Sequence, residues 1–467
     1  CRRHPAFCRI STINESMVQT PIMDKRKERR MLEEYRKEHF FCGCGREHAN
    51  PIDEIVIGPG ALVQLSSAPE RLGLGRNAML ITDEAIMGIM GDAILAQLHT
   101  ACDDVRVLAY PLPVMPDEKH IFEVLRMYNS AVDFFVAAGT GAVNDITRFL
   151  SAKLSVPYLS IPTAPSMDGY SAKVSLLFVD GVKQTLEAIY PKAIYADTDY
   201  LKHAPKKLLA AGVGDLAAKI TACADWKISH LINDEYYCQE SVDKLMRVVE
   251  ESMAISTGLA QNDEHAVQAL TEGLMLSGIV MHWVGSSRPA AGAEHHITHF
   301  WGMQSGSPQH LHGIEVAVGT LIMLQTYAKL AEFDFSTVNA EAVAARMPDQ
   351  TTWRSQVEAV CGQHAPVIFA QQTDKIFDKE KILRRIQRIQ SCEAEIKRVI
   401  ADVTRYEPVL RHALEVLGAP TTAAALGIRP DDLRTSFLWA KEMRPKYVVL
   451  DLAYDLGILE QLADSIA

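Results

Sequence analysis

The sequence predicts an α/β protein in which a Rossmann-like, doubly wound domain is followed by an all-helical domain. Three observations lead to this prediction. Short apolar runs alternate with helix-length segments as far as about residue 200, and a glycine-rich turn directly follows one of these runs. Beyond residue 200 the strand signal fades, and apolar residues recur at three- and four-residue spacing. The 467 residues suffice for two or three domains.

We expect three regions along the chain. Residues 1–50 form a partly disordered leader, 51–200 a nucleotide-binding domain, and 201–467 a helical domain that binds metal and substrate. Within the leader, residues 25–38 alternate in charge, which is typical of an exposed helix or of a segment that orders on docking. No apolar stretch follows Arg2, so the start does not have the features of a signal peptide.

The apolar runs of the second region predict the strands of a mainly parallel sheet. Helical spacing between them predicts helices at residues 85–99 and 118–131, and residues 177–181 predict an added hairpin. The predicted strands are 55–57, 78–81, 105–110, 134–138, 158–161 and 193–196.

In the third region, helical spacing is clearest over residues 240–260, 264–285 and 313–333. Residues 379–403 interleave Arg and Lys with Ile and Glu. That pattern is typical of a partly exposed helix, with a binding role as the alternative.

Composition limits the possible functions. The net charge of −11 disfavours a general nucleic-acid or anionic-membrane binder, and no run of about 18 apolar residues predicts a membrane span. A small anionic substrate would therefore need a local cation or metal site. The nine cysteines are scattered, which favours free thiols in a reducing cytoplasm over a disulfide framework.

The glycine-rich turn is the first candidate site. It follows the predicted strand 134–138 and opens a helix that runs through Leu154, so free N–H groups and the helix dipole could hold a pyrophosphate. Asn144 replaces the third glycine of the usual Rossmann fingerprint, so an ordinary strand-to-helix turn is the alternative. The residues of the turn are Gly139, Thr140, Gly141, Ala142, Val143, Asn144 and Asp145.

Two further strand ends carry polar side chains. Thr163, Ser166 and Asp168 follow the predicted strand 158–161, where ligands of such sheets bind, although Pro, Ser and Gly here also suit a simple turn. Asp83 could accept hydrogen bonds from ribose hydroxyls or act as a helix N-cap.

The helical half contains the candidate metal ligands. Asp215 lies in a glycine-rich stretch expected to open a helix through Trp226. His295 and His299 are one helical turn apart, and His312 follows soon after. A carboxylate and two imidazoles suit a divalent transition metal and leave a coordination position for substrate, whereas a lone buried histidine is usually structural.

A second metal-like pattern lies in the leader, where Cys42, Cys44 and His48 form Cys-x-Cys followed by His. Only three ligands are evident, and the spacing fits no closed structural zinc pattern, so binding and non-binding interpretations both stay open.

Taken together, the motifs resemble the sn-glycerol-1-phosphate dehydrogenase family, within the iron-type alcohol dehydrogenase and dehydroquinate synthase superfamily. The resemblance spans about residues 54–330 and is carried by PTAPSMDGYSAKVS, AAGVGDLAAKITACADWKIS, SSRPAAGAEHHITHFWGM and LHGIEVAVGT. CGCGREH resembles bacterial members, and the part after about residue 340 matches weakly. The resemblance implies a dehydroquinate synthase-like fold with the active site between its two domains.

The resemblance also implies site residues. Asp215, His295 and His312 match metal ligands, with His296 beside the pattern and not a ligand. His299, Asp168 and Asp215 match catalytic and substrate-binding positions, His299 as proton source and Asp168 as a contact to a substrate hydroxyl. The segment from Gly141 to Asp145 matches a pyrophosphate turn, and Thr163 to Ser166 matches a nicotinamide-contacting stretch. Lys219 and Arg288 are candidate phosphate-binding cations or structural ion-pair partners.

Two positions depart from the family pattern. Ala172 stands where a second serine usually contacts the cofactor, a loss worth about 1 kcal/mol if buried. Ile314 follows His312-Gly313, where relatives tend to carry a polar residue. These departures concern cofactor affinity and preference rather than the metal ligands.

The implied activity is the reversible, metal-dependent reduction of dihydroxyacetone phosphate to sn-glycerol 1-phosphate by NAD(H) or NADP(H). Zinc, nickel and iron all suit the ligands, and the family suggests a homo-oligomer. The alternatives are a glycerol dehydrogenase, a dehydroquinate-synthase-like cyclase, or a non-catalytic nucleotide-binding regulator.

Overall fold

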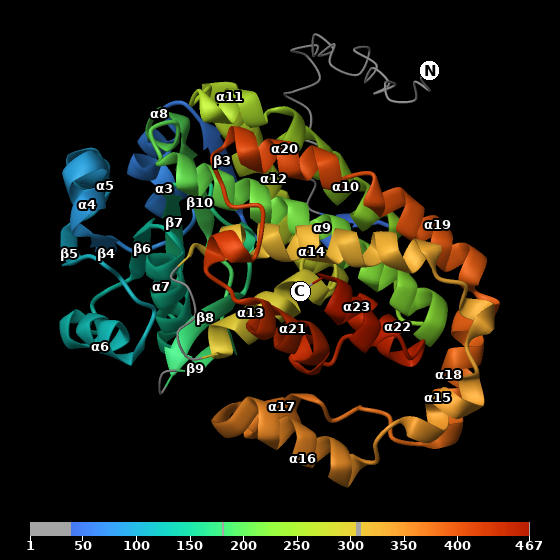
Figure 1. Cartoon of the computed structure of the whole chain (residues 1–467). Coiled ribbons are helices and arrows are strands. Elements are labelled where there is room, and N and C mark those ends of the chain that lie inside the picture. The colour runs from blue at the N-terminus through green and yellow to red at the C-terminus, as the bar shows by residue number, and fades with distance from the viewer. Residues whose placement is uncertain (1–38, 180–181, 305–309, 467) are drawn as a thin grey trace, which may run out of the picture.

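The computed structural model describes residues 39–179, 182–304 and 310–466. It has an N-terminal α/β domain and a C-terminal helical domain, as predicted (Figure 1). The expectations for residues 1–38 lie outside the described residues.

A six-stranded parallel sheet forms the α/β domain, in the order β3-β10-β7-β6-β4-β5. All six predicted runs are strands. The apolar side chains of the four inner strands are buried on both faces, as expected for a sheet covered by helices, whereas those of the edge strands β3 and β5 are partly buried. The strands are β3 (Glu54–Gly58), β4 (Asn77–Asp83), β5 (Asp104–Tyr110), β6 (Phe134–Gly139), β7 (Tyr158–Pro162) and β10 (Ala193–Asp197).

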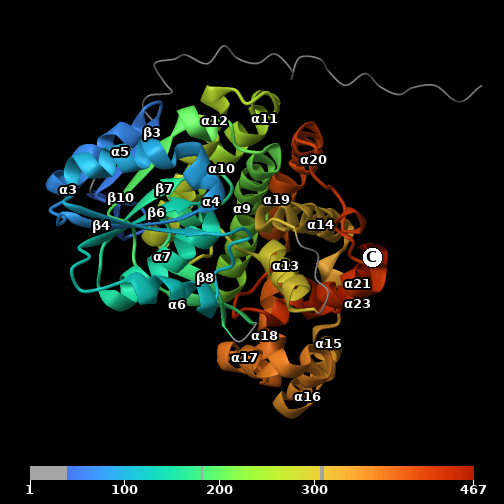
Figure 2. The same cartoon turned by 90° about the vertical axis from the view of Figure 1, so that its left-hand side faces the viewer.

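Helices cover the two faces of the sheet. Alternate residues of β4 point to opposite sides, so Leu80 packs with Ile94 of α5 (Asp92–Ala101), whereas Ile81 packs with Ile146 of α7 (Gly141–Leu154). Figure 2 shows the sheet between these layers. The other elements of the layers are η2 (Ala61–Ser67), α3 (Ala68–Arg71), α4 (Glu84–Ile86), η3 (Met87–Gly91), α6 (Glu118–Met127) and α8 (Thr198–Leu201).

The strand order reverses between β4 and β6. From β4 the chain crosses to β5 on one side and returns to β6 on the other, so the carboxyl ends of β4 and β6 flank the point where doubly wound sheets bind ligands. Asp83 ends β4, and Gly139 ends β6. The fold therefore brings two predicted cofactor residues to the same crevice.

Two antiparallel hairpins lie outside this sheet. β8 (Val174–Val179) pairs with β9 (Val182–Glu187) and confirms the predicted hairpin. β1 (His39–Phe41) pairs with β2 (Glu47–Ala49), so the last part of the segment interpreted as a leader is a hairpin.

The helical domain packs around the long helix α9 (Lys206–Asn233), against which α14 (His312–Glu332) lies. The remaining helices are α10 (Gln239–Ala254), α11 (Ser256–Ala260), α12 (Glu264–Val284), α13 (Ala293–Met303), α15 (Ala340–Arg346), α16 (Gln350–Cys361), α17 (Ala365–Gln371), α18 (Lys379–Ser391), α19 (Glu393–Thr404), α20 (Glu407–Val416), α21 (Pro430–Trp439), α22 (Val449–Asp455) and α23 (Leu459–Ile466), with short 3₁₀ turns η4 (Asp168–Ser171), η5 (Phe335–Thr337), η6 (Gly362–His364), η7 (Ala424–Leu426) and η8 (Ala440–Glu442).

Several predicted helix limits were wrong. The helix expected to open at Asp215 begins at Lys206, so Asp215 lies in its interior. The helix expected over 118–131 ends at Met127, and the one expected over 379–403 is divided at Cys392. α9 begins directly after Pro205, and α6 ends where Tyr128 takes an extended conformation, so local backbone features mark both limits.

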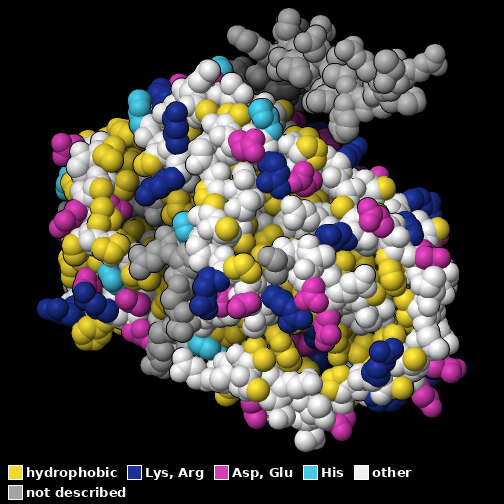
Figure 3. All heavy atoms as spheres, viewed as in Figure 1, with side chains coloured by type: hydrophobic (Ala, Val, Ile, Leu, Met, Phe, Trp, Pro, Cys, Tyr) yellow, Lys and Arg dark blue, Asp and Glu magenta, His cyan; other side chains and the backbone are white. Residues whose placement is uncertain are grey.

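Among the described residues, α14 is long and apolar enough to cross a membrane by length and composition, but 72% of its most apolar window is buried inside the protein. Burial of this kind is typical of a core helix. On the face shown in Figure 3, acidic and basic side chains are interspersed.

Candidate active site

Asp215 is positioned by two glycines on α9. A Cβ on Gly212 would lie 2.0 Å from the Pro165 carbonyl oxygen, and one on Gly214 would lie 2.2 Å from the Gly313 carbonyl oxygen. Only glycine lets α9 approach both the turn after β7 and the start of α14 this closely. The same glycines led the sequence-based interpretation to start the helix too late.

Asp215 and Asp168 share one buried cation. The Lys219 ammonium lies 2.9 Å from Asp168 Oδ2 and 3.1 Å from Asp215 Oδ1. The Asp168 amide donates to Asp215 Oδ2 at 2.8 Å, and the Ser277 hydroxyl donates to Asp168 Oδ2 at 2.8 Å. The network joins the turn after β7 to α9 and α12, and therefore joins the sheet to the helices.

Burial and charge determine protonation in this network. Burial alone would raise the pKa of Asp168, but the Lys219 ammonium outweighs it and the pKa is lowered. Burial and the neighbouring Asp168 carboxylate raise the pKa of Asp215. Asp168 is consequently an ionised acceptor in a nearly closed site.

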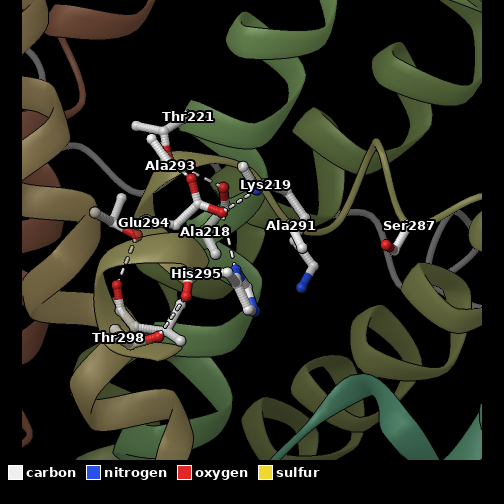
Figure 4. Close-up of polar contacts among 12 residues, drawn as sticks. Ala218, Lys219, Thr221, Ser287, Ala291, Ala293, Glu294, His295 and Thr298 are labelled. Carbon is white, nitrogen blue, oxygen red and sulfur yellow. Dashed lines mark hydrogen bonds and ion pairs between the residues drawn. The ribbon is translucent and has the colours of Figure 1, made fainter. Parts of the chain in front are cut away.

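His295 is oriented by a carboxylate. Its Nδ1 lies 2.9 Å from Glu294 Oε1, and because a carboxylate only accepts, Nδ1 carries the proton and Nε2 is left as the ligand atom. Glu294 also accepts from the Thr221 hydroxyl and the Gly292 amide, each at 2.6 Å. Figure 4 shows Thr221 and Lys219 on α9 facing Glu294 and His295 on α13.

Glu294 is fully buried, yet its carboxylate stays charged. Burial raises its pKa, but the hydrogen bond and charge of His295 and the Thr221 hydroxyl outweigh that effect, so the pKa is lowered. A charged acceptor at Nδ1 raises the basicity of the histidine toward a metal.

Three histidines converge beside Asp215. The ring centroids lie 5.2 Å apart for His295 and His312, 6.2 Å for His295 and His299, and 6.1 Å for His299 and His312. The pKa of Asp215 is raised overall, and a protonated His295 would only partly offset that rise, which means that the ring and the carboxylate are close. A carboxylate with two imidazoles is a donor set that a divalent transition metal accepts, and the orientation of His295 fits it.

His296 is directed elsewhere. It is 1% exposed, neither ring nitrogen has a hydrogen-bond partner, and burial with nearby cations lowers its pKa well below the usual value. It is therefore neutral and separate from the Asp215 site.

The glycine-rich turn opens α7 directly after β6. No side chain caps the start of α7, so its first N–H groups are available to an anion. A Cβ on Gly141 would lie 2.9 Å from the Met167 sulfur, and one on Gly139 would lie 2.8 Å from Val143 side-chain carbons. The turn therefore packs closely, with Ala142 half-buried at the start of the helix.

Asn144 and Asp145 face inward from this turn. The Asn144 amide donates to the Ser160 hydroxyl at 3.2 Å, and Asp145 Oδ1 accepts from the buried Arg148 guanidinium at 3.0 Å. Arg148 also donates to the Val174 carbonyl at 2.7 Å and to the Gly169 carbonyl. Arg148, paired with Asp145, therefore holds the turn after β7 in place through Gly169.

The turn after β7 carries one buried hydroxyl without a hydrogen-bond partner. This is Thr163 Oγ1, and an unpaired buried polar atom beside a predicted cofactor site fits a ligand contact. The hydrogen bond of Ser166 lowers the pKa of Tyr170, although burial raises it more. Ala172 is 6% exposed, so the missing serine hydroxyl would have been buried.

Asp83 caps α4. Its Oδ1 accepts from the Ile86 amide at 2.9 Å, which is the N-cap alternative considered for it. It nevertheless stands at the crevice where the strand order reverses.

Both candidate phosphate cations are held in ion pairs. Lys219 is fully buried between Asp168 and Asp215. Arg288 donates to the Glu235 carboxylate at 2.6 and 2.7 Å and to the Tyr447 carbonyl at 2.8 Å. In this structure both side chains are therefore ion-pair partners, which is the second of the two roles considered for them.

Sequence reasoning missed Glu294, Thr221 and Ser277. Glu294 had one available signal, since it directly precedes the histidine pair. Thr221 and Ser277 had none, because each reaches the site only through helix packing.

Known proteins resemble this chain both in sequence and in fold. Residues 56–205 match the family of iron-containing alcohol dehydrogenases. Glycerol-1-phosphate dehydrogenase (NAD(P)+) of Geobacillus stearothermophilus is 34% identical over 324 residues, which cover 67% of this chain and 78% of the relative. The enzyme of the same name from Bacillus subtilis strain 168 is 33% identical over 323 residues, 66% and 80% of the two chains. That from Pyrococcus horikoshii is 30% identical over 274 residues, 58% and 77% of the two chains.

Solved structures show the same fold. The alcohol dehydrogenase from Oenococcus oeni has a TM-score of 0.60 and 13% identity, covering 89% of this chain and 98% of that one. The glycerol dehydrogenase from Schizosaccharomyces pombe has a TM-score of 0.55 and 14% identity, covering 89% and 90%. At such low sequence identity, these structures show a shared fold alone.

Proposed function

This chain belongs to the glycerol-1-phosphate dehydrogenase family, a family of NAD(P)-dependent oxidoreductases, and we propose that it reduces dihydroxyacetone phosphate reversibly to sn-glycerol 1-phosphate with NADH or NADPH. The product is a precursor of glycerophospholipids. The observation that carries the proposal is the link between the Asp168 amide and Asp215 at 2.8 Å, because it places the strand-end turn of the sheet against the metal-ligand helix.

One divalent ion, zinc or nickel, would be held by Asp215, His295 and His312. When bound there, such an ion supplies Lewis acidity toward a substrate oxygen. The hydrogen bond from His295 Nδ1 to Glu294 supports this assignment, because it leaves Nε2 as the ligand atom.

The dinucleotide would bind at the crevice between β4 and β6 and supply the hydride. The uncapped start of α7 receives the pyrophosphate, with close backbone approach at Gly139 and Gly141. The unpaired Thr163 hydroxyl would contact the nicotinamide. Asp83 would accept hydrogen bonds from the ribose hydroxyls, with its carboxylate held in place by its capping contact to Ile86.

Two side chains act on the substrate in this proposal. Asp168, kept ionised by Lys219, accepts a hydrogen bond from a substrate hydroxyl and fixes its orientation. His299, half-buried beside His312, holds the proton that the developing hydroxyl needs, a task for which an imidazole is well suited.

We also propose where the enzyme works, what it binds and how it assembles. We place it in the cytoplasm, which is supported by the seven free cysteines among the described residues. Its partner molecule is a small phosphorylated triose, and the working form is a homo-oligomer.

The deciding experiment follows NADH absorbance with dihydroxyacetone phosphate, using chelated enzyme and enzyme reloaded with zinc or nickel. We expect oxidation that returns only with metal, and chiral analysis that identifies the 1-phosphate enantiomer. Turnover of glycerol without its phosphate, or an absence of net NADH change under every metal, would instead favour the glycerol dehydrogenase or the cyclase alternative.

A matched pair of variants isolates the metal ligands. His312→Ala should lower kcat/KM by on the order of 10³-fold or more, comparable to the loss of a preorganised electrostatic group, with an unchanged circular dichroism spectrum. His310→Ala, an exposed histidine two positions earlier, should keep full activity. Full activity in His312→Ala would refute the ligand assignment.

A further inference from the structure

A second cluster of potential metal ligands lies far along the chain from the histidines of the candidate active site. Cys42 and Cys44 from the turn of the β1–β2 hairpin, His48 from β2 and Cys238 from the N-cap of α10 bring four ligand atoms within 4.8 Å of one another. We propose that these residues bind one structural zinc ion that fastens the N-terminal hairpin to the helical domain. The proposal does not depend on the dehydrogenase reaction.

The distances between ligand atoms match a tetrahedral site. With Zn–S bonds of about 2.3 Å and a Zn–N bond of about 2.0 Å, tetrahedral ligand atoms lie about 3.5–3.8 Å apart. Here Cys42 and Cys238 sulfurs are 3.5 Å apart, and His48 Nε2 lies 3.4 Å from the Cys44 sulfur and 3.6 Å from the Cys238 sulfur. A disulfide would need two sulfurs at about 2.05 Å.

Hydrogen bonds at the sulfurs fit thiolates. The Cys44 amide donates to the Cys42 sulfur at 3.5 Å, and the Tyr236 hydroxyl donates to the Cys44 sulfur at 3.1 Å. The Ser241 amide and hydroxyl donate to the Cys238 sulfur at 3.4 and 3.1 Å. Each sulfur therefore accepts a hydrogen bond, which is the role of a metal-bound thiolate.

Two nearby features favour negative charge at Cys238 and around Tyr236. Cys238 stands at the positive end of α10, and the Arg46 guanidinium lies 3.4 Å from the Tyr236 ring centroid. One contact opposes a thiolate at Cys42, because the Glu240 Oε2 atom lies 3.4 Å from its sulfur. The Glu240 side chain is 42% exposed and pairs with Lys244, so it can turn away from a thiolate.

Aromatic rings close the site on one side. His48 stacks on Trp283 with ring centroids 5.5 Å apart, and Phe40 meets both rings edge-on at 5.2 Å. His48 itself is 1% exposed. A closed, water-poor site with four protein ligands is the arrangement of structural zinc, and three thiolates favour zinc over harder ions.

The short β1–β2 hairpin requires additional contacts to be stable. Each of its strands has three residues, and an isolated two-stranded hairpin of this size is marginal in water. Two hydrogen bonds attach the hairpin to α12. The Trp283 indole donates to the Ala49 carbonyl at 3.0 Å, and Arg46 donates to the Val284 carbonyl at 3.0 Å. A metal that joins Cys42 to Cys238 spans 196 positions and ties the hairpin to α10 directly.

Cobalt substitution of the full-length protein provides the test. The catalytic ligands include no sulfur, so a sulfur-to-cobalt charge-transfer band reports this site alone. We expect the band in the unmodified protein, in His312→Ala and in Cys102→Ser, whose buried thiol belongs to the sheet core. We expect its loss in Cys238→Ser and Cys44→Ser, and elemental analysis of the same variants in their zinc form should find one zinc fewer per chain.

A second measurement avoids mutation altogether. Titrating the native chain with a thiol-specific mercurial should release one zinc, followed with a colorimetric chelator, and should lower the melting temperature. The proposal is overturned if the unmodified protein shows no charge-transfer band, if Cys238→Ser retains it, or if mass spectrometry finds a Cys42–Cys238 disulfide.

Discussion

At the scale of single residues, Glu294 shows how a buried charge supports a metal ligand. Its carboxylate accepts from Thr221, Gly292 and His295, so a group that would be costly to bury alone is fully hydrogen-bonded. In return it fixes the His295 tautomer. The proposed ligand set therefore depends on a residue that does not touch the ion.

Glu294→Gln should weaken metal binding rather than prevent folding. Gln keeps the shape but loses the charge, and loss of such a partner typically lowers affinity by about 10- to 100-fold. Competition with a chelator of known affinity measures the change. Glu341→Gln, on the exposed start of α15, serves as the control. Equal affinities in the two variants would argue that Glu294 has no role in metal binding.

At the scale of elements, the spacing of α9 and α14 sets the separation of Asp215 and His312. Gly214 allows the Gly313 backbone of α14 to pass against α9, while Gly319 of α14 passes close to the Glu294 backbone of α13. The three helices that carry the proposed ligands are thus held together by close backbone contacts.

Gly214→Ala should destabilise the protein by about 3 kcal/mol, the upper range for overpacking, because the new methyl meets a carbonyl that cannot rotate away. Activity should fall as well, since Asp215 is the next residue. Gly302→Ala, in α13 with nothing within 4 Å of its Cβ position, should be neutral or slightly stabilising. Urea unfolding compares the two, and equal stability would contradict the close packing of α9 and α14.

The pair α16 and α17 projects from the helical domain in both views (Figures 1 and 2). It is attached through Glu442, whose Oε2 accepts from the Trp353 indole at 3.1 Å and from the Lys375 ammonium at 2.6 Å, while Lys441 pairs with Oε1. Burial opposes ionisation, but Lys441 and Lys375 outweigh it and lower the pKa of Glu442 to about 2.

Because the pKa of Glu442 is lower in the folded state than in the unfolded state, its contribution is complete above the unfolded value of 4.5 and is lost as pH falls toward about 2. Glu442→Gln should lower the free energy of unfolding by about 3 kcal/mol at pH 7. The difference in stability between the variant and the unmodified protein should shrink below a pH of about 4.5. Thermal unfolding at several pH values measures it, and Glu380→Gln, at an exposed pair, is the control. A pH-independent difference would contradict the charged state.

At the scale of the whole molecule, the proposed site is divided between two domains. The sheet contributes the crevice between β4 and β6, and the helices contribute Asp215 and the histidines. Asp168 links them, since its turn follows β7 while its carboxylate lies against α9 and α12. Each half can therefore be disturbed separately.

Gly141→Val should abolish the rise in melting temperature caused by NADH while keeping the rise caused by metal, and Asp215→Asn should do the reverse. A ligand at 100 times its Kd stabilises the folded state by about 2.7 kcal/mol, which thermal scanning resolves. The unmodified protein should show both rises. Loss of both in either variant would indicate that the halves do not bind independently.

The sequence by itself determined the doubly wound sheet, the helical second half and the family. Alternation of apolar runs is a local signal, and it placed all six strands. The spacing of His295 and His299 predicted that they share one helix face, and the structure brings both rings close to the ring of His312. Only the tertiary structure decided that α9 continues through Gly212 and Gly214, that Glu294 orients His295, and that Cys238 completes the Cys42, Cys44 and His48 cluster. Gly212, Gly214 and Cys238 contact elements that are remote along the chain, so these contacts arise from the packing of whole elements, and no short-range pattern encodes them. Glu294 directly precedes His295, but its buried charge is stabilised by Thr221 of α9, a contact that only helix packing creates.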